Sequence, residues 1–141
     1  MTAIPGAVSF NLVPGGVAPG SNSIAVTTMW SGLTLLSAVN EYAFFGSAAM
    51  ALSSSAPITS IPSSCVSGQV LTGSPTTFTP FTQASPFGAG SSLQLFTISS
   101  ILTVGNSSRT DNLSLSINLS SLPQLPAATY TGVLFIVAQV M

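Results

Sequence analysis

The chain has 141 residues, of which 46% are hydrophobic and only 2% carry a charged side chain. It holds one Arg, no Lys and no His, so it lacks the cations that neutralise phosphates, which excludes nucleic-acid binding and electrostatic membrane binding. The length indicates one domain, and its polar surface must come from amides and from the hydroxyls of 25 Ser and 15 Thr.

The near-absence of charge bears on assembly. A net charge near zero removes the repulsion that keeps monomers apart, which favours a subunit that polymerises over a free monomer. The longest apolar run, residues 133–138, is far shorter than the ~20 residues of a membrane helix, so no membrane insertion is expected. Residues 1–5 lack the basic and apolar regions of a signal peptide.

The chain begins with a short alternating run at residues 7–12. Val8, Phe10 and Leu12 share one side, which is typical of a strand. Prolines and glycines follow over residues 13–21. We therefore predict an N-terminal arm and linker over residues 1–22 and a β-sandwich domain over residues 23–141. The arm is either a first strand with an ordinary loop or a donor strand that pairs with another subunit.

The next strands are expected at residues 23–30 and 39–45. In the first, Ile24, Val26, Thr28 and Trp30 share a face. Residues 33–37 either continue that strand or form a turn. Residues 48–52 read as another strand or as one helical turn, the one place where the pattern allows a helix.

Prolines punctuate residues 53–92 and confine any strands there, near 65–71 and 77–82, to sheet edges. A strand is expected over residues 92–104. The clearest alternation follows over 111–119, with four apolar residues facing inward: Leu113, Leu115, Ile117 and Leu119. About seven to nine short strands at this spacing predict an all-β antiparallel sandwich or barrel.

Residues 130–141 form a last strand that does not alternate. Val133, Phe135 and Val137 lie on one face, and the opposite face is apolar too. Both faces therefore need cover, which places this strand in the middle of a sheet or at an edge that another strand covers. We predict that Val133, Phe135 and Val137 accept a neighbour's strand.

The chain offers little chemistry. Without His, no Ser or Cys nucleophile has an imidazole base. Glu41 and Asp111 lie far apart in sequence, and Asp111 is expected to pair with Arg109. The lone cysteine, Cys65, is expected to be a small buried hydrophobe. We predict no enzyme activity, no cofactor and no metal site.

Three Asn-x-Ser triplets begin at Asn106, Asn112 and Asn118. They are candidate glycosylation sites where the host has the machinery, and a chain rich in Ser and Asn also contains such triplets by chance. Asn112 and Asn118 fall on the outward face of the predicted strand over 111–119, where a glycan has room.

The segment Leu125-Pro126-Ala127-Ala128-Thr129-Tyr130-Thr131-Gly132-Val133-Leu134 resembles the closing motif Pro-Ala-Gly-x-Tyr-x-Gly-x-Leu of secreted pilin-like and spore-coat-U-type proteins. Ala128 stands where that motif has Gly. The resemblance covers about ten residues. It implies an immunoglobulin-like sandwich that lacks one strand, with a neighbour's terminal segment completing it by donor-strand complementation.

The first hypothesis is therefore an extracellular, cell-surface filament or pilus subunit that polymerises head to tail with copies of itself. In it, Val8, Phe10 and Leu12 form the donor strand. A jelly-roll coat subunit of a virus or spore is the second hypothesis. The third is a carbohydrate-binding or adhesive module, for which Trp30, Tyr42 and Phe44 are the candidate aromatic residues.

Overall fold

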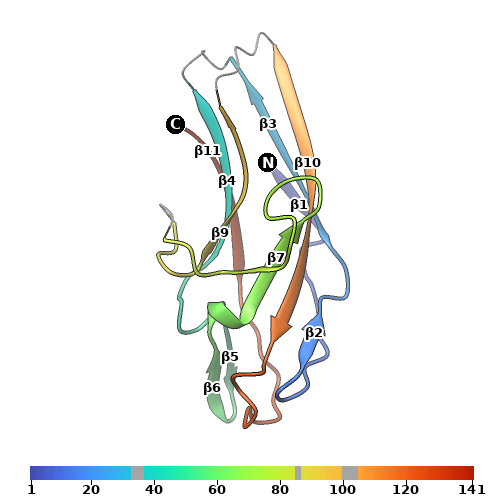
Figure 1. Ribbon diagram of the computed structural model, residues 1–141, viewed down its shortest axis with the longest axis vertical. Helices are drawn as coiled ribbons and strands as arrows, with labels where there is room; N and C mark the ends of the chain where they lie inside the picture. The colour runs from blue at the N-terminus through green and yellow to red at the C-terminus, as the bar shows by residue number, and fades with distance from the viewer. Residues whose placement is uncertain (33–36, 85–86, 100–104) are drawn as a thin grey trace.

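A computed structural model of the chain describes residues 1–32, 37–84, 87–99 and 105–141. In these residues nearly all of the regular structure is antiparallel β-sheet, arranged as two facing layers (Figure 1). The predicted all-β antiparallel sandwich is confirmed. The described residues include no helix with the length and hydropathy to span a bilayer.

The larger layer holds six strands in the described residues. Their order is β1 (Thr2–Ile4), β3 (Ile24–Ser31), β10 (Asn106–Asn118), β7 (Val66–Val70) and β8 (Thr79–Pro80), and β2 (Val17–Pro19) also pairs with β10. The long strand β10 is the centre of this sheet, because β3 pairs with its first half and β2 and β7 pair with its second half.

The smaller layer contains three strands in the order β11 (Leu134–Val140), β4 (Ala38–Phe45) and β9 (Ser92–Ser99). A separate hairpin of β5 (Leu52–Ser55) and β6 (Ile58–Ile61) lies at the lower end in Figure 1 and leads into a 3₁₀ turn, η1 (Ser63–Cys65). β11 is therefore an edge strand, paired with β4 alone among the described strands.

The core forms between the inner faces of the two layers. The predicted inward set is confirmed, because Leu113, Leu115 and Ile117 of β10 and Leu119 just after it are all buried. They meet apolar side chains of the smaller layer, among them Ala43, Phe45, Leu93 and Leu95. Cys65 is buried in the same cluster as a free thiol, as predicted. Burial of this kind stabilises the fold by about 1.5–3 kcal/mol for each large side chain.

Several predicted elements differ from the structure. Residues 7–12 form an extended segment with one bridge pair, Phe10 with Gly20, in place of a strand. Two strands lie where the sequence pattern was weakest: β2 within the Pro/Gly-rich linker, and the β5–β6 hairpin after Ser-rich residues. These segments become strands because they hydrogen-bond to a neighbouring strand, and the alternation of side chains along the sequence does not reveal that pairing.

The short strands expected near 65–71 and 77–82 are present as β7 and β8. β8 lies at the sheet edge as expected, but β7 pairs with both β10 and β8, so its confinement to an edge was wrong. At residues 48–52, where a strand or a helical turn was expected, the chain bends and β5 begins only at Leu52. The ambiguous stretch at 33–37 and the end of the strand predicted over 92–104 fall largely on residues 33–36 and 100–104, outside the described residues.

Candidate functional site

A groove of about 870 Å³ opens between the N-terminal residues and the residues that lead into β11. One wall is formed by residues 1–3 and 5–12, and the other by residues 128–134 with Ile136. The groove thus runs along the side of the sandwich where β11 ends the smaller sheet.

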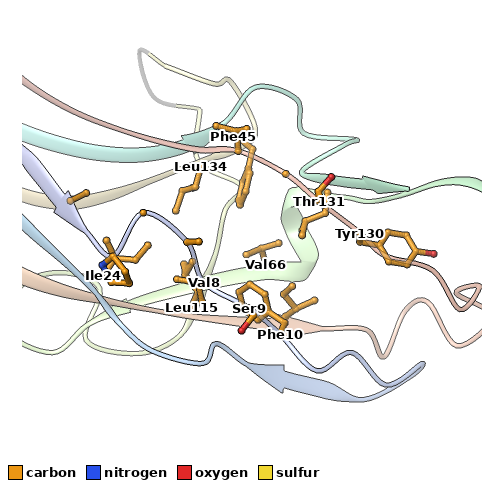
Figure 2. A pocket seen from close by; sticks show the side chains of 18 of the residues that line it. Val8, Ser9, Phe10, Ile24, Phe45, Val66, Leu115, Tyr130, Thr131 and Leu134 are labelled. Atoms are coloured by element: carbon orange, nitrogen blue, oxygen red, sulfur yellow. The ribbon is translucent and has the colours of Figure 1, made fainter. Parts of the chain in front are cut away.

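The floor of the groove is the hydrophobic core itself. Core side chains from both layers reach it: Ile24, Phe45, Val66, Leu115 and Ile117. Figure 2 shows Phe45 and Leu134 on one side of the groove and Ile24, Val8 and Leu115 on the other. An occupant of this groove would therefore bury apolar atoms against the interior of the protein, which is the main source of binding free energy for such a surface.

The β11 wall also offers unpaired backbone groups. Ala38 and Met141 exchange two hydrogen bonds, of 2.7 and 2.8 Å, at the end of the β11–β4 ladder. Hydrogen-bonded and non-hydrogen-bonded pairs alternate along an antiparallel ladder, and the register here is continuous. It follows that Leu134, Ile136 and Ala138 turn their N–H and C=O groups away from β4, toward an edge that no described strand covers.

The segment before β11 is held by contacts of Tyr130, Thr131 and Gly132. The Tyr130 hydroxyl donates to the Pro126 carbonyl oxygen at 2.9 Å, within the same turn. Thr131 exchanges hydrogen bonds of 2.8 and 2.9 Å with Ser53 of β5. Gly132 passes so close to Ala51 that no side chain fits there. These contacts deliver Leu134 into the core at the start of β11.

The opposite wall is the predicted donor segment, and it packs against its own chain. Val8, Phe10 and Leu12 are partly buried against the core cluster. The Ser21 N–H donates to the Ser9 carbonyl oxygen at 2.8 Å, and the Ser9 N–H donates to the Ser21 Oγ at 3.2 Å. The three predicted donor residues therefore lie together and line one side of the groove of their own chain.

Of the predicted acceptor residues, Phe135 and Val137 lie on β11 and Val133 comes just before it. Val133 is 64% exposed and lines the groove. Phe135 is 48% exposed and stacks on Phe44 with ring centroids 5.3 Å apart, so it belongs to the outer face. Val137 lies opposite Tyr42 and does not line the groove. The inward residues are instead Leu134 and Ile136, which alternation could not identify because both faces are apolar.

None of the chain's three charged side chains lines the groove. Arg109 forms an ion pair with Asp111, as predicted, and donates to the Thr72 carbonyl oxygen at 2.6 Å. Its guanidinium carbon lies 4.3 Å from the centre of the Phe96 ring, a cation–π contact. Arg109 and Asp111 therefore satisfy each other, and Glu41 takes no part in this ion pair.

Glu41 is 2% exposed and points from β4 toward β3. Its carboxyl accepts a hydrogen bond from the Thr28 hydroxyl, and its other oxygen has no partner among the described residues. Burial raises the pKa of the Glu41 carboxyl, with the Thr28 hydrogen bond opposing the rise. Within the described residues, no cluster of His, Cys, Asp or Glu could hold a metal ion.

The three candidate carbohydrate-contacting aromatics do not form one surface. Tyr42 and Phe44 both contact Phe87, with ring centroids 6.3 and 5.7 Å apart. Trp30 lies in the other layer and packs on Phe96 at 6.2 Å. The asparagines of the three candidate glycosylation triplets, Asn106, Asn112 and Asn118, are all exposed on β10. The Asn118 Oδ1 accepts a hydrogen bond from the Ser120 N–H at 3.0 Å.

Comparison with models of protein families finds no match for this chain. Searches of curated proteins and of solved structures likewise find no match.

Proposed function

We propose that this protein is a structural subunit of an extracellular filament or pilus, and that copies assemble head to tail by donor-strand complementation. The observation that carries the proposal is the groove beside β11, whose floor is the hydrophobic core. A strand from a neighbouring copy would fill it and complete the sandwich, in the mode by which an extended segment adds to an exposed sheet edge.

The free edge of β11 supports the same proposal. Soluble proteins usually protect an exposed edge with charges, prolines or bulges, because a bare edge pairs with other chains. β11 has no charged residue and no Pro, and it lies at the edge of its sheet in the described part of the structure. Such an edge is suited to a permanent partner strand.

Energetics allow a stable contact. Each large apolar side chain that the incoming strand buries contributes ~1.5–3 kcal/mol before the entropy costs of association. Each copy would receive a strand from one neighbour in its groove and give its own strand to another neighbour, so the contact is heterologous and can repeat without closing, which gives an open filament. The near-absence of charge removes repulsion between successive copies.

Two substitutions on neighbouring residues of β11 test the proposal. Leu134→Gln puts an amide into the groove, whereas Phe135→Gln alters the outer face of the same strand. We expect wild type and Phe135→Gln to form filaments visible by negative-stain electron microscopy, and Leu134→Gln to remain monomeric. Circular dichroism and thermal unfolding of each monomer separate a blocked groove from a lost fold.

A wild-type protein that stays monomeric at all concentrations contradicts the proposal. A folded Leu134→Gln protein that forms filaments as well as Phe135→Gln does so too, because the groove would then have no part in assembly.

A further inference from the structure

We infer that the groove receives the leading residues, 1–7, of a second copy of this chain, while residues 8–12 stay on their own subunit. This inference rests on the proposed function and changes which residues of the N-terminal arm form the donor strand. It treats residues 8–12 as a permanent wall of the groove and residues 1–7 as the exchanged strand.

Residues 8–12 are poorly suited to leave. Val8, Phe10 and Leu12 are packed against the core of their own chain. A Cβ built on Gly20 would lie 2.8 Å from the Val8 Cγ1 and 3.4 Å from the Phe10 Cε1, so this segment sits directly on the Gly20 backbone. Withdrawing it would uncover the core side chains that it covers. The identical segment of a neighbour could bury them again, but it would add no further burial.

Residues 1–7 can leave at little cost. All seven are exposed, and none belongs to the core cluster or packs against it, so leaving their own subunit uncovers little of the core. Their attachment is the short ladder between β1 and β3, in which Thr2, Ala3 and Ile4 pair with residues 25–27. The backbone hydrogen bonds lost from β3 would form again on the free edge of a neighbour's β11, so the exchange conserves hydrogen bonds and adds apolar burial.

The dimensions and chemistry of the groove fit this occupant. Thr2–Ile4 are already extended as β1, and they can pair with part of the seven-residue strand β11. Residues 1–7 include Met1, Ala3, Ile4 and Ala7, and no side chain among them is charged. The groove lining contains no charged side chain either. A second copy of this chain is therefore a complementary partner, whereas a charged segment would be desolvated without a counter-ion.

Two reversible disulfide locks separate the two halves of the arm. Ser9→Cys with Ser21→Cys ties residues 8–12 to their own subunit, at two exposed positions that already share a backbone hydrogen bond. Thr2→Cys with Thr27→Cys ties residues 1–7 to their own β3, at two positions that are paired in register. Paired positions of this kind have the Cα separation that a disulfide requires. The native Cys65 is buried, and thiol counting verifies each lock.

Each variant is compared in its oxidised and reduced forms by sedimentation and negative-stain microscopy. We expect the 9–21 lock to leave the yield of filaments unchanged. The 2–27 lock should abolish filaments when oxidised, and reduction should restore them. Filaments lost on oxidation of the 9–21 pair, or retained on oxidation of the 2–27 pair, would overturn the inference while leaving strand exchange intact. If wild type and both reduced variants form no filaments, the proposed function fails as well.

Discussion

The backbone at Gly132 passes so close to Ala51 that a Cβ on Gly132 would lie 2.0 Å from the Ala51 carbonyl oxygen. This approach sets the path by which the chain enters β11 and turns Leu134 toward the core. Gly132→Ala therefore forces two backbone segments apart. Overpacking typically lowers the free energy of unfolding by about 1–3 kcal/mol. Because the added methyl group meets the Ala51 backbone, we expect a loss at or above the top of that range.

Urea unfolding of Gly132→Ala and of Gly6→Ala measures this effect. A Cβ on Gly6 meets nothing within 4 Å, so Gly6→Ala is the matched control and should change the free energy of unfolding little. Equal stabilities for the two variants would show that the close approach at Gly132 does not exist in solution.

Tyr130→Phe removes the hydroxyl that donates to the Pro126 carbonyl oxygen and leaves the ring in place. A single hydrogen bond of this kind contributes about 0.5–1.5 kcal/mol to stability, and the exposed position points to the lower end. We expect a small fall in thermal midpoint and no change in filament formation. A variant that does not fold would contradict this, because the hydroxyl would then be needed for the stability of the whole domain.

Glu41 makes the stability of the monomer depend on pH. Its pKa in the folded state is raised above the unfolded value, chiefly by burial, so protonation favours the folded state. The full stability is then present below the unfolded pKa, and it declines as the pH rises from there through the folded pKa. We expect the free energy of unfolding to be larger in mild acid than at neutral pH.

Glu41→Gln keeps an oxygen that can accept from Thr28 and removes the ionisation. The difference in unfolding free energy between this variant and wild type, measured by urea unfolding across the pH range, should grow in favour of Gln as the pH rises. Asp111 and Arg109, which act electrostatically on Glu41, are present in both proteins. A difference that does not change with pH would refute the raised pKa.

Arg109→Met should destabilise the monomer strongly. Asp111 is 3% exposed, and without the guanidinium the one side-chain hydrogen bond left to its carboxylate from the described residues would be that from the Thr72 hydroxyl, at 2.8 Å. Breaking a buried ion pair from one side costs about 3–5 kcal/mol, and the partial exposure of Arg109 lowers this somewhat. The double variant Arg109→Met with Asp111→Asn should recover much of the loss in urea unfolding. No recovery would point to the cation–π contact with Phe96 as the main contribution of Arg109.

The strands of the core could be predicted because one of their faces is apolar and the other polar. The alternation of Leu113, Leu115 and Ile117 identifies the inner face of β10 from sequence alone, and Ile24, Val26 and Thr28 do the same for β3. The same rule cannot orient β11, where both faces are apolar. Only the pairing of Leu134 with Phe45 in register places Leu134 inward.

The groove could be anticipated only in part. Two unusual segments, the N-terminal arm and the doubly apolar last strand, were recognisable from composition and turn out to face each other across it. The packing of Val8 and Phe10 on Gly20 could not be foreseen, because it depends on the bend of the Pro/Gly-rich linker that returns the chain to β3. The exposure of residues 1–7 likewise depends on tertiary packing that no local pattern encodes.

The central claim is that the outer edge of β11 pairs with a strand of another copy. Residue-resolved amide hydrogen exchange tests it most directly. In the monomer, the amides of Phe135, Val137 and Gln139 should be protected by the ladder to β4, and those of Ile136 and Ala138 should exchange fast.

The same amide hydrogen exchange is then carried out on intact filaments, which are dissolved under quenching conditions before the readout. In the filament the Ile136 and Ala138 amides should be protected as well, so that protection along β11 no longer alternates. If those two amides exchange as fast in the filament as in the monomer, the edge is still free after assembly and the claim is contradicted.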